Sequence, residues 1–97
     1  MNTREKALAL NALSRFSLEL DCDNRWFVSH PRVDIKEIEH PGGIWSVTGR
    51  GDTPEDAIED HWCKLTAPGQ NHCIVVNALC DNRRRVRWNG FMWEDVK

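Results

Sequence analysis

The sequence predicts an α+β domain in which two helices pack on one face of a mainly antiparallel sheet, with a β-hairpin at the C-terminus. Two segments have the apolar spacing of helices, and the segments around them are short and rich in β-branched and aromatic residues. The order is a helix, two or three strands, a second helix and three more strands, which is typical of layered α+β architectures. A chain of 97 residues has room for one domain, which we expect to span residues 1–97.

The first helix is predicted from Thr3 to about Phe16. Good helix formers dominate this segment, and apolar side chains recur at spacings of three and four residues at Ala9, Leu13, Phe16 and Leu20. One face of this helix can therefore pack on a sheet.

Strands are predicted between the two helices. Alternation from Leu18 onwards predicts a first hairpin that turns near Asp23 and Asn24. Residues 44–51 are rich in β-branched and aromatic side chains, and they predict one strand that ends at Gly49–Gly51.

The segment between these strands, residues 30–43, has two interpretations. Val33 and Ile35 are separated by charged residues, and a Pro-Gly-Gly turn follows at Pro41–Gly43. The segment is therefore either an edge strand or a long loop.

The best-marked helix is predicted at residues 52–66. Thr53 stands at the N-cap, and Pro54 fits the first helical position, where its missing N–H costs no hydrogen bond. Acidic residues follow, where they interact favourably with the positive end of the helix dipole: Glu55, Asp56, Glu59 and Asp60. Apolar residues at i, i+4 and i+7 form one stripe for the core: Ile58, Trp62 and Leu65.

The C-terminal segment predicts a strand at residues 73–79 and then a hairpin. Asn89–Gly90 is a strong signal for a two-residue type I′ turn, in which both central residues have positive φ. Such a turn pairs Trp88 with Phe91, Arg87 with Met92, Val86 with Trp93, and Arg85 with Glu94. Alternation then places Val86, Trp88, Phe91 and Trp93 on a core face, and Arg85, Arg87, Met92 and Glu94 on the opposite face.

The charge balance argues against general nucleic-acid binding. The net charge is -2 and the pI about 6.0, whereas small nucleic-acid-binding domains have a pI above about 9. The N-terminus lacks the apolar core of a signal peptide, and no apolar run approaches the roughly 18 residues of a membrane helix. We therefore expect a cytoplasmic protein without a membrane partner, in which Cys22, Cys63, Cys73 and Cys80 are buried free thiols.

No motif predicts catalysis, a metal or a cofactor. The cysteines and histidines lack paired spacings such as C-x-x-C, which place two zinc ligands on one turn. No nucleophile motif surrounds a cysteine, and the helix start explains the paired carboxylates of residues 55–60. We expect that the protein is not an enzyme and uses no cofactor.

Two charged surfaces remain as candidate partner-binding sites. The acidic helix could imitate phosphates and engage a basic groove of a host protein through Glu55, Asp56, Glu59 and Asp60. The basic face of the hairpin could engage an acidic protein patch or nucleic acid through Arg84, Arg85 and Arg87. Exposed strands at the end of the chain also leave a homodimer open.

Residues 49–62, GRGDTPEDAIEDHW, resemble the strand-to-helix junction of HicB-type antitoxins, whose small β-β-β-α domain carries a G-D-T-P-E-E-A-like sequence. Gly51 to Ala57 match that sequence in type and order. The N-terminal helix and the added C-terminal strands depart from the family, and no DNA-binding helix-turn-helix is recognisable. The α-β-β-β-α order is also similar to the double-stranded RNA-binding domain, although acids stand where that family has a lysine cluster.

The chain as a whole is short, acidic and rich in tryptophan. In this it is similar to phage accessory proteins, including anti-CRISPR and anti-restriction inhibitors. The resemblance implies a non-enzymatic protein-binding module of a phage or mobile element that inhibits a host defence or nucleic-acid-processing protein. The alternative is a nucleic-acid-binding protein or a HicB-like antitoxin.

Overall fold

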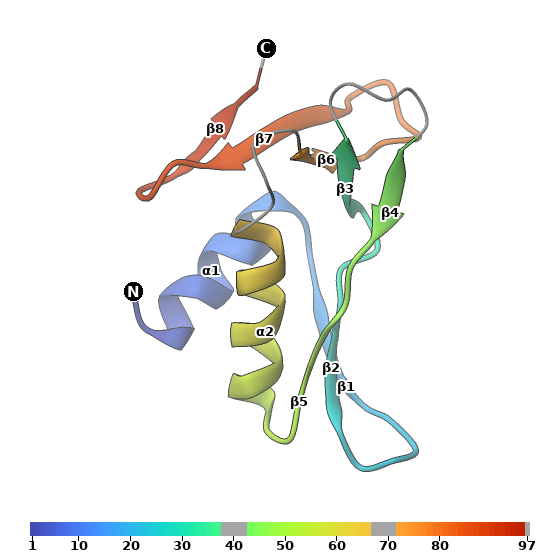
Figure 1. The fold of residues 1–97 in the computed structure, drawn as a ribbon, viewed down its shortest axis with the longest axis vertical. Coiled ribbons are helices and arrows are strands. Elements are labelled where there is room, and N and C mark those ends of the chain that lie inside the picture. The colour runs from blue at the N-terminus through green and yellow to red at the C-terminus, as the bar shows by residue number, and fades with distance from the viewer. Residues whose placement is uncertain (38–42, 67–71, 97) are drawn as a thin grey trace.

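The computed structural model describes residues 1–37, 43–66 and 72–96, which form two helices and eight strands (Figure 1). The helices are α1 (Thr3–Leu13) and α2 (Pro54–Thr66). One antiparallel sheet has the order β1 (Ser17–Leu20), β2 (Trp26–Ser29), β5 (Gly49–Gly51). The other has the order β4 (Ile44–Ser46), β3 (Val33–Glu37), β6 (His72–Val76), β7 (Arg84–Trp88), β8 (Trp93–Asp95). The predicted α+β class with a C-terminal hairpin is confirmed, and its strands are divided between two sheets.

Two pairs of consecutive strands link the sheets. β2 continues into β3 through residues 30–32, and β4 continues into β5 through residues 47–48 (Figure 1). The prediction of one strand over residues 44–51 is therefore wrong. The ladder is interrupted where the chain passes between sheets, and the Thr48 carbonyl there accepts a hydrogen bond of 2.9 Å from Lys64 Nζ of α2.

Residues 30–43 include a strand, β3, as one of the two interpretations predicted, but it is a central strand and not an edge strand. The interpretation as a long loop is wrong for Val33–Glu37. β3 pairs with β4 on one side and with β6 on the other. Val33 and Ile35 are buried, and Asp34 and Lys36 point to the opposite face of the sheet. Of the predicted turn, Pro41 and Gly42 lie outside the described residues.

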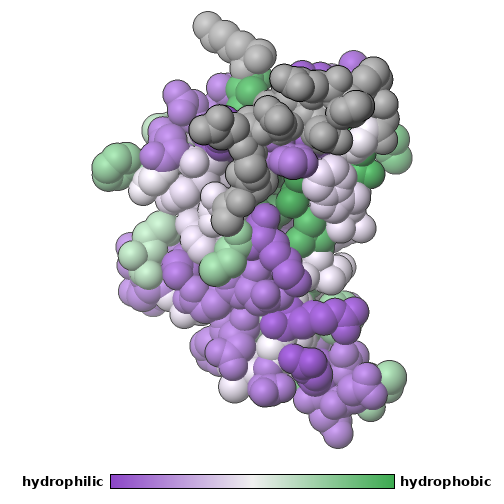
Figure 2. Space-filling model, viewed as in Figure 1, coloured by the Kyte–Doolittle hydropathy of each residue, from purple (hydrophilic) through white to green (hydrophobic). Residues whose placement is uncertain are grey.

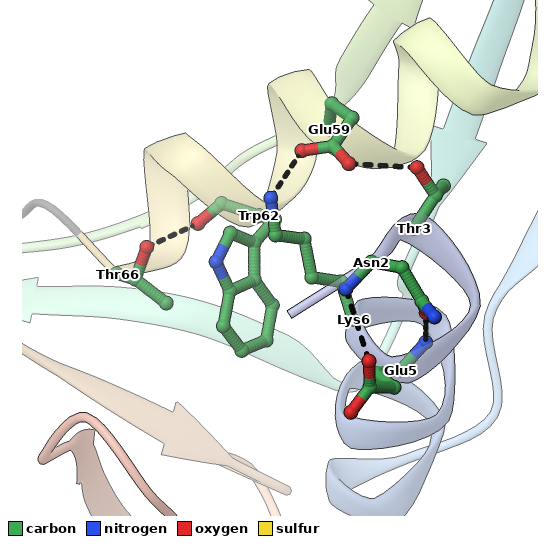
Figure 3. A network of polar contacts seen from close by, with 7 residues as sticks. All are labelled: Asn2, Thr3, Glu5, Lys6, Glu59, Trp62 and Thr66. Carbon is green, nitrogen blue, oxygen red and sulfur yellow. Dashed lines mark hydrogen bonds and ion pairs between the residues drawn. The ribbon is translucent and has the colours of Figure 1, made fainter.

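Helix α1 is shorter than predicted, because it ends at Leu13 and the Ser14 backbone is extended. The Ser14 carbonyl lies 2.7 Å from His30 Nε2, a tertiary contact that propensity cannot anticipate. Leu10 and Leu13 are buried, whereas Leu20, expected on the same stripe, is exposed in β1. A capping box of Asn2 and Glu5 defines the start of the helix (Figure 3).

Helix α2 is confirmed, with Pro54 at its first position and Thr53 Oγ1 accepting a 3.1 Å hydrogen bond from the Asp56 amide. The predicted stripe of Ile58, Trp62 and Leu65 is buried. The helix packs on β5 and β2. Contact with β5 is close enough that a Cβ added at Gly49 would lie 2.3 Å from the Ala57 carbonyl oxygen. Gly49, which has no side chain, therefore allows the backbones of β5 and α2 to lie in contact.

The C-terminal hairpin forms with a different turn from the one predicted. Trp88 pairs with Trp93, so the loop contains residues 89–92 rather than two residues. Gly90 has positive φ but Asn89 does not, and Asn89 Oδ1 instead accepts hydrogen bonds of 2.9 Å from the amides of Phe91 and Met92. Phe91 is consequently 92% exposed, and its predicted place in the core is wrong.

Trp93 pairs with Trp88, two residues away from Val86, its predicted partner. Because side chains alternate between the two faces with a period of two, Trp93 still lies on its predicted core face. The Trp88 and Trp93 rings are 5.0 Å apart, and both meet Trp62 of α2 edge to face. Trp93 Nε1 also donates a 2.8 Å hydrogen bond to the Ala9 carbonyl of α1. These tryptophans join the hairpin to both helices.

The register of the hairpin predicts that substitutions at two aromatic residues change the free energy of unfolding by different amounts. Phe91→Ser should change the free energy of unfolding by less than about 0.5 kcal/mol, as for most surface positions. Trp93→Ala should lower the free energy of unfolding by about 3 kcal/mol, because it removes ring contacts and a hydrogen bond from the core. Urea unfolding followed by circular dichroism measures both, and equal losses would contradict the register.

All four cysteines are free thiols, but only Cys73 is buried. Cys22 and Cys80 lie in turns, and Cys63 faces solvent from α2, so the expectation of buried thiols is wrong for these three. Within the described ranges, no three His, Cys, Asp or Glu side chains gather as metal ligands would. In the same part of the chain, neither helix has the length and apolar character needed to cross a membrane.

Candidate partner-binding groove

Two of the four acidic residues predicted on α2 are engaged within the fold. Glu59 accepts hydrogen bonds from Thr3 Oγ1 and Lys6 Nζ of α1, at 2.7 and 2.5 Å (Figure 3). Hydrogen bonds from Lys6 and Thr3 lower the pKa of Glu59. Burial raises the pKa of Asp60, but hydrogen bonds from Lys64 and the Arg50 amide outweigh it and leave the pKa below its ordinary value.

The remaining acidic residues of this helix, Glu55 and Asp56, are exposed at its first turn. The structure thus divides the predicted acidic surface. Two carboxylates attach α2 to α1 and β5, and two face solvent. The surface of the molecule over α2 is mainly hydrophilic (Figure 2).

The three arginines predicted on the hairpin do not form one patch. Arg84 lies on the same face of β7 as Val86 and is 3.4 Å from Asp95 of β8. Arg87 lies on the opposite face and donates a 2.7 Å hydrogen bond to the His72 carbonyl. Arg85 is exposed on that face and lines a hollow of about 300 Å³ with Lys36 and Arg83.

This hollow belongs to a longer groove on the outer face of the five-stranded sheet, opposite the core face. The register places Asp34, Val75 and Arg85 in one row across β3, β6 and β7. Adjoining hollows share lining residues, and they continue past the β6–β7 loop to the junction of α1 with β1. We call this the basic groove, after the cations that line it: Arg15, Arg32, Lys36, Arg83 and Arg85.

The groove cations differ from most other cations of the chain in having no carboxylate partner among the described residues. Outside the groove, five cations are within 4.0 Å of a carboxylate oxygen: Lys6 with Glu59, Arg25 with Asp52, Arg50 with Asp21, Lys64 with Asp60 and Arg84 with Asp95. Unpaired like charges gathered in one groove repel one another, and an anionic partner would relieve that repulsion.

The groove also has apolar and acidic surface. Val75 forms part of its floor, and Ile44 and Leu79 on its walls are 44% and 101% exposed. Asp34 and Asp81 line its middle portion, and burial raises the pKa of Asp34. The groove can therefore accept side chains of mixed character.

A buried histidine pair supports the end of the groove next to α1. His30 Nε2 lies 2.7 Å from the Ser14 carbonyl oxygen, which can only accept, so Nε2 carries the hydrogen. His30 Nδ1 is then an acceptor, and His61 Nε2, 3.1 Å away, must donate to it. His61 Nδ1 is left as a lone pair with no hydrogen-bond partner among the described residues.

Comparisons with known proteins add no family to these observations. The chain matches none of the protein-family models, curated proteins or solved structures with which it was compared.

Most of the groove has no signature in the sequence. Arg83 and Arg85 were visible in the run RRRVR, but Arg15 and Arg32 each stand alone in the sequence. Only the pairing of β3 with β6 and of β6 with β7 brings Lys36 and Arg85 to one surface.

Proposed function

We propose that the chain is a non-enzymatic protein-binding module whose basic groove receives an acidic segment of a partner protein. The observation that carries this proposal is the contrast between the groove cations and the five paired cations elsewhere. A partner carboxylate would form the ion pairs that Asp34 and Asp81, which also line the groove, do not form with these cations.

An acidic protein segment fits the groove better than nucleic acid. Asp34 and Asp81 would repel a continuous phosphate backbone, whereas a peptide can place apolar side chains between its acids, against Val75, Ile44 and Leu79. Trp62, Trp88 and Trp93, which could stack on bases, pack against one another.

The kind of partner protein is inferred from the resemblance of this short, acidic, tryptophan-rich chain to phage accessory proteins. A small protein of this kind, made by a phage or mobile element, would occupy a surface of a host defence or nucleic-acid-processing protein. The exposed Glu55 and Asp56 form a second surface on the same chain, and they could extend the contact to a basic patch of that partner.

A peptide-binding measurement tests the groove. A labelled ten-residue peptide of alternating Glu and Leu should bind the wild type, and the charge reversals Arg83→Glu with Arg85→Glu should weaken binding about tenfold or more. The control carries the same charge change at exposed sites elsewhere, Arg4→Glu with Arg25→Glu, and should bind like the wild type.

Two outcomes would contradict the proposal. One is equal binding by both double variants, which would show that net charge alone decides. The other is tighter binding of a single-stranded or duplex oligonucleotide than of the peptide at 150 mM salt, which would favour nucleic acid as the partner.

A further inference from the structure

The largest hollow of the groove lies where α1 meets β1 and has a distinct chemistry. Its volume is about 540 Å³, and it is lined by Ser14, Arg15, Phe16, Ser17, Ser29, Pro31 and Arg32. Two guanidinium-bearing and three hydroxyl-bearing residues thus meet there without a carboxylate. The hollow next to it, by contrast, includes Asp34.

The backbone holds these donors close together. Ser17 pairs directly with Ser29 across β1 and β2, which places their side chains side by side on one face, with Cβ atoms roughly 5 Å apart. The Ser14 carbonyl is bound to His30 of the β2–β3 connection, and the Phe16 ring meets the His30 ring edge to face at 5.8 Å. Residues 14–17 are therefore fixed against the β2–β3 connection before any ligand arrives.

The two arginines are available to a ligand. Arg15 and Arg32 are exposed, and neither side chain has a hydrogen-bond or ion-pair partner in the part of the chain that the structure describes. Each guanidinium presents donors in a planar fork that suits two oxygens of one anion. Two such forks and adjacent hydroxyl groups offer more donors than a single carboxylate can use.

We propose that this hollow binds a phosphate monoester, and that the acidic segment received by the basic groove carries a phosphorylated side chain. The inference rests on the proposed function and adds the chemistry of one partner residue. A phosphate monoester carries a charge of about −1.5 to −2 at pH 7 and three acceptor oxygens, so it matches two guanidinium charges and the neighbouring hydroxyl groups.

Three ligands test this inference against the wild type. They are the labelled Glu/Leu peptide, the same peptide with one central phosphoserine, and inorganic phosphate, the peptides measured by fluorescence anisotropy and the phosphate by ³¹P NMR titration. Phosphoserine should strengthen peptide binding about tenfold, and inorganic phosphate should compete more strongly with the phosphopeptide than with the plain peptide.

Two double variants show which arginines are responsible for the stronger binding of the phosphopeptide. Arg15→Ala with Arg32→Ala should remove the phosphoserine gain, so that the two peptides bind this variant with equal affinity. Both peptides should bind it more weakly than the wild type, because two groove cations are lost. Arg83→Glu with Arg85→Glu should weaken both peptides by a similar factor. All four positions are exposed, so thermal unfolding curves close to the wild type should show that the variants are folded.

Each result separates the inference from the proposed function. Equal affinity for the two peptides, or a phosphoserine gain that survives Arg15→Ala with Arg32→Ala, overturns the phosphate site and leaves the groove proposal standing. Phosphate binding that depends on these arginines, without binding of either peptide, supports the site and overturns the peptide groove. A 5′-phosphorylated oligonucleotide that binds more tightly than the phosphopeptide overturns the assignment to a phosphorylated protein.

Discussion

Gly49→Ala should destabilise the fold by about 3 kcal/mol or more, the upper part of the range for over-packed sites. The new Cβ would lie 2.3 Å from the Ala57 carbonyl oxygen and 2.4 Å from His61 Cβ. Two of the three nearest atoms belong to the α2 backbone, so no rotamer change relieves the contact, and strand and helix must separate. For a domain of this size, we expect a fall in Tm of roughly 12 °C or more.

Thr48→Ala provides the matched control for this prediction. Thr48 precedes Gly49 in the chain, its side chain is exposed, and its carbonyl bond to Lys64 does not need the side chain. Thermal unfolding by circular dichroism should show a Tm close to that of the wild type for Thr48→Ala. If Gly49→Ala were as stable as this control, the close contact between β5 and α2 would be contradicted.

Acidification from pH 7 to pH 4 should lower the free energy of unfolding by about 3 kcal/mol, because a buried histidine pair takes up a proton. Burial lowers the pKa of His61 to about 4, and the nearby His30 and Lys64 add to this effect while Asp60 opposes it. Burial also lowers the pKa of His30, against the hydrogen bond with Ser14. A proton on His61 would enter at Nδ1, which is buried without an acceptor among the described residues.

The direction of the pH effect follows from the lowered pKa. Between the unfolded pKa of about 6.5 and the folded pKa of about 4, the unfolded chain binds a proton that the folded chain does not, so stability rises with pH. The contribution is fully present above about pH 6.5 and is lost as the pH falls towards 4.

Urea unfolding followed by tryptophan fluorescence between pH 4 and 7 measures this loss. In His61→Gln, the side-chain amide can still donate to His30 Nδ1 but does not titrate. Its stability at pH 7 should be lower than that of the wild type, and its loss on going to pH 4 should be smaller by about 3 kcal/mol. An equal acid-induced loss in both proteins would assign the pH dependence to other groups.

Sequence patterns predicted the elements whose signals are local. Thr53 and Pro54 begin α2 as expected, and Ile58, Trp62 and Leu65 form its buried stripe. One error lies where a distant contact intervenes, because hydrogen bonding between His30 and Ser14 accompanies the early end of α1. The other is local: the Phe91 and Met92 amides donate hydrogen bonds to Asn89 Oδ1, and these bonds accompany a longer hairpin loop.

The sequence by itself determined the two helix starts, the α+β class and the sorting of Val86, Trp88 and Trp93 towards the core, because caps and side-chain alternation depend on neighbouring residues. Only the tertiary structure decided which charges are free. The ion pairs among the described residues mostly join positions far apart in the chain, such as Lys6 with Glu59 across 53 positions. Whether an arginine belongs to the fold or to the basic groove therefore depends on strand pairing, which places Arg84 beside Asp95 and turns Arg85 outward.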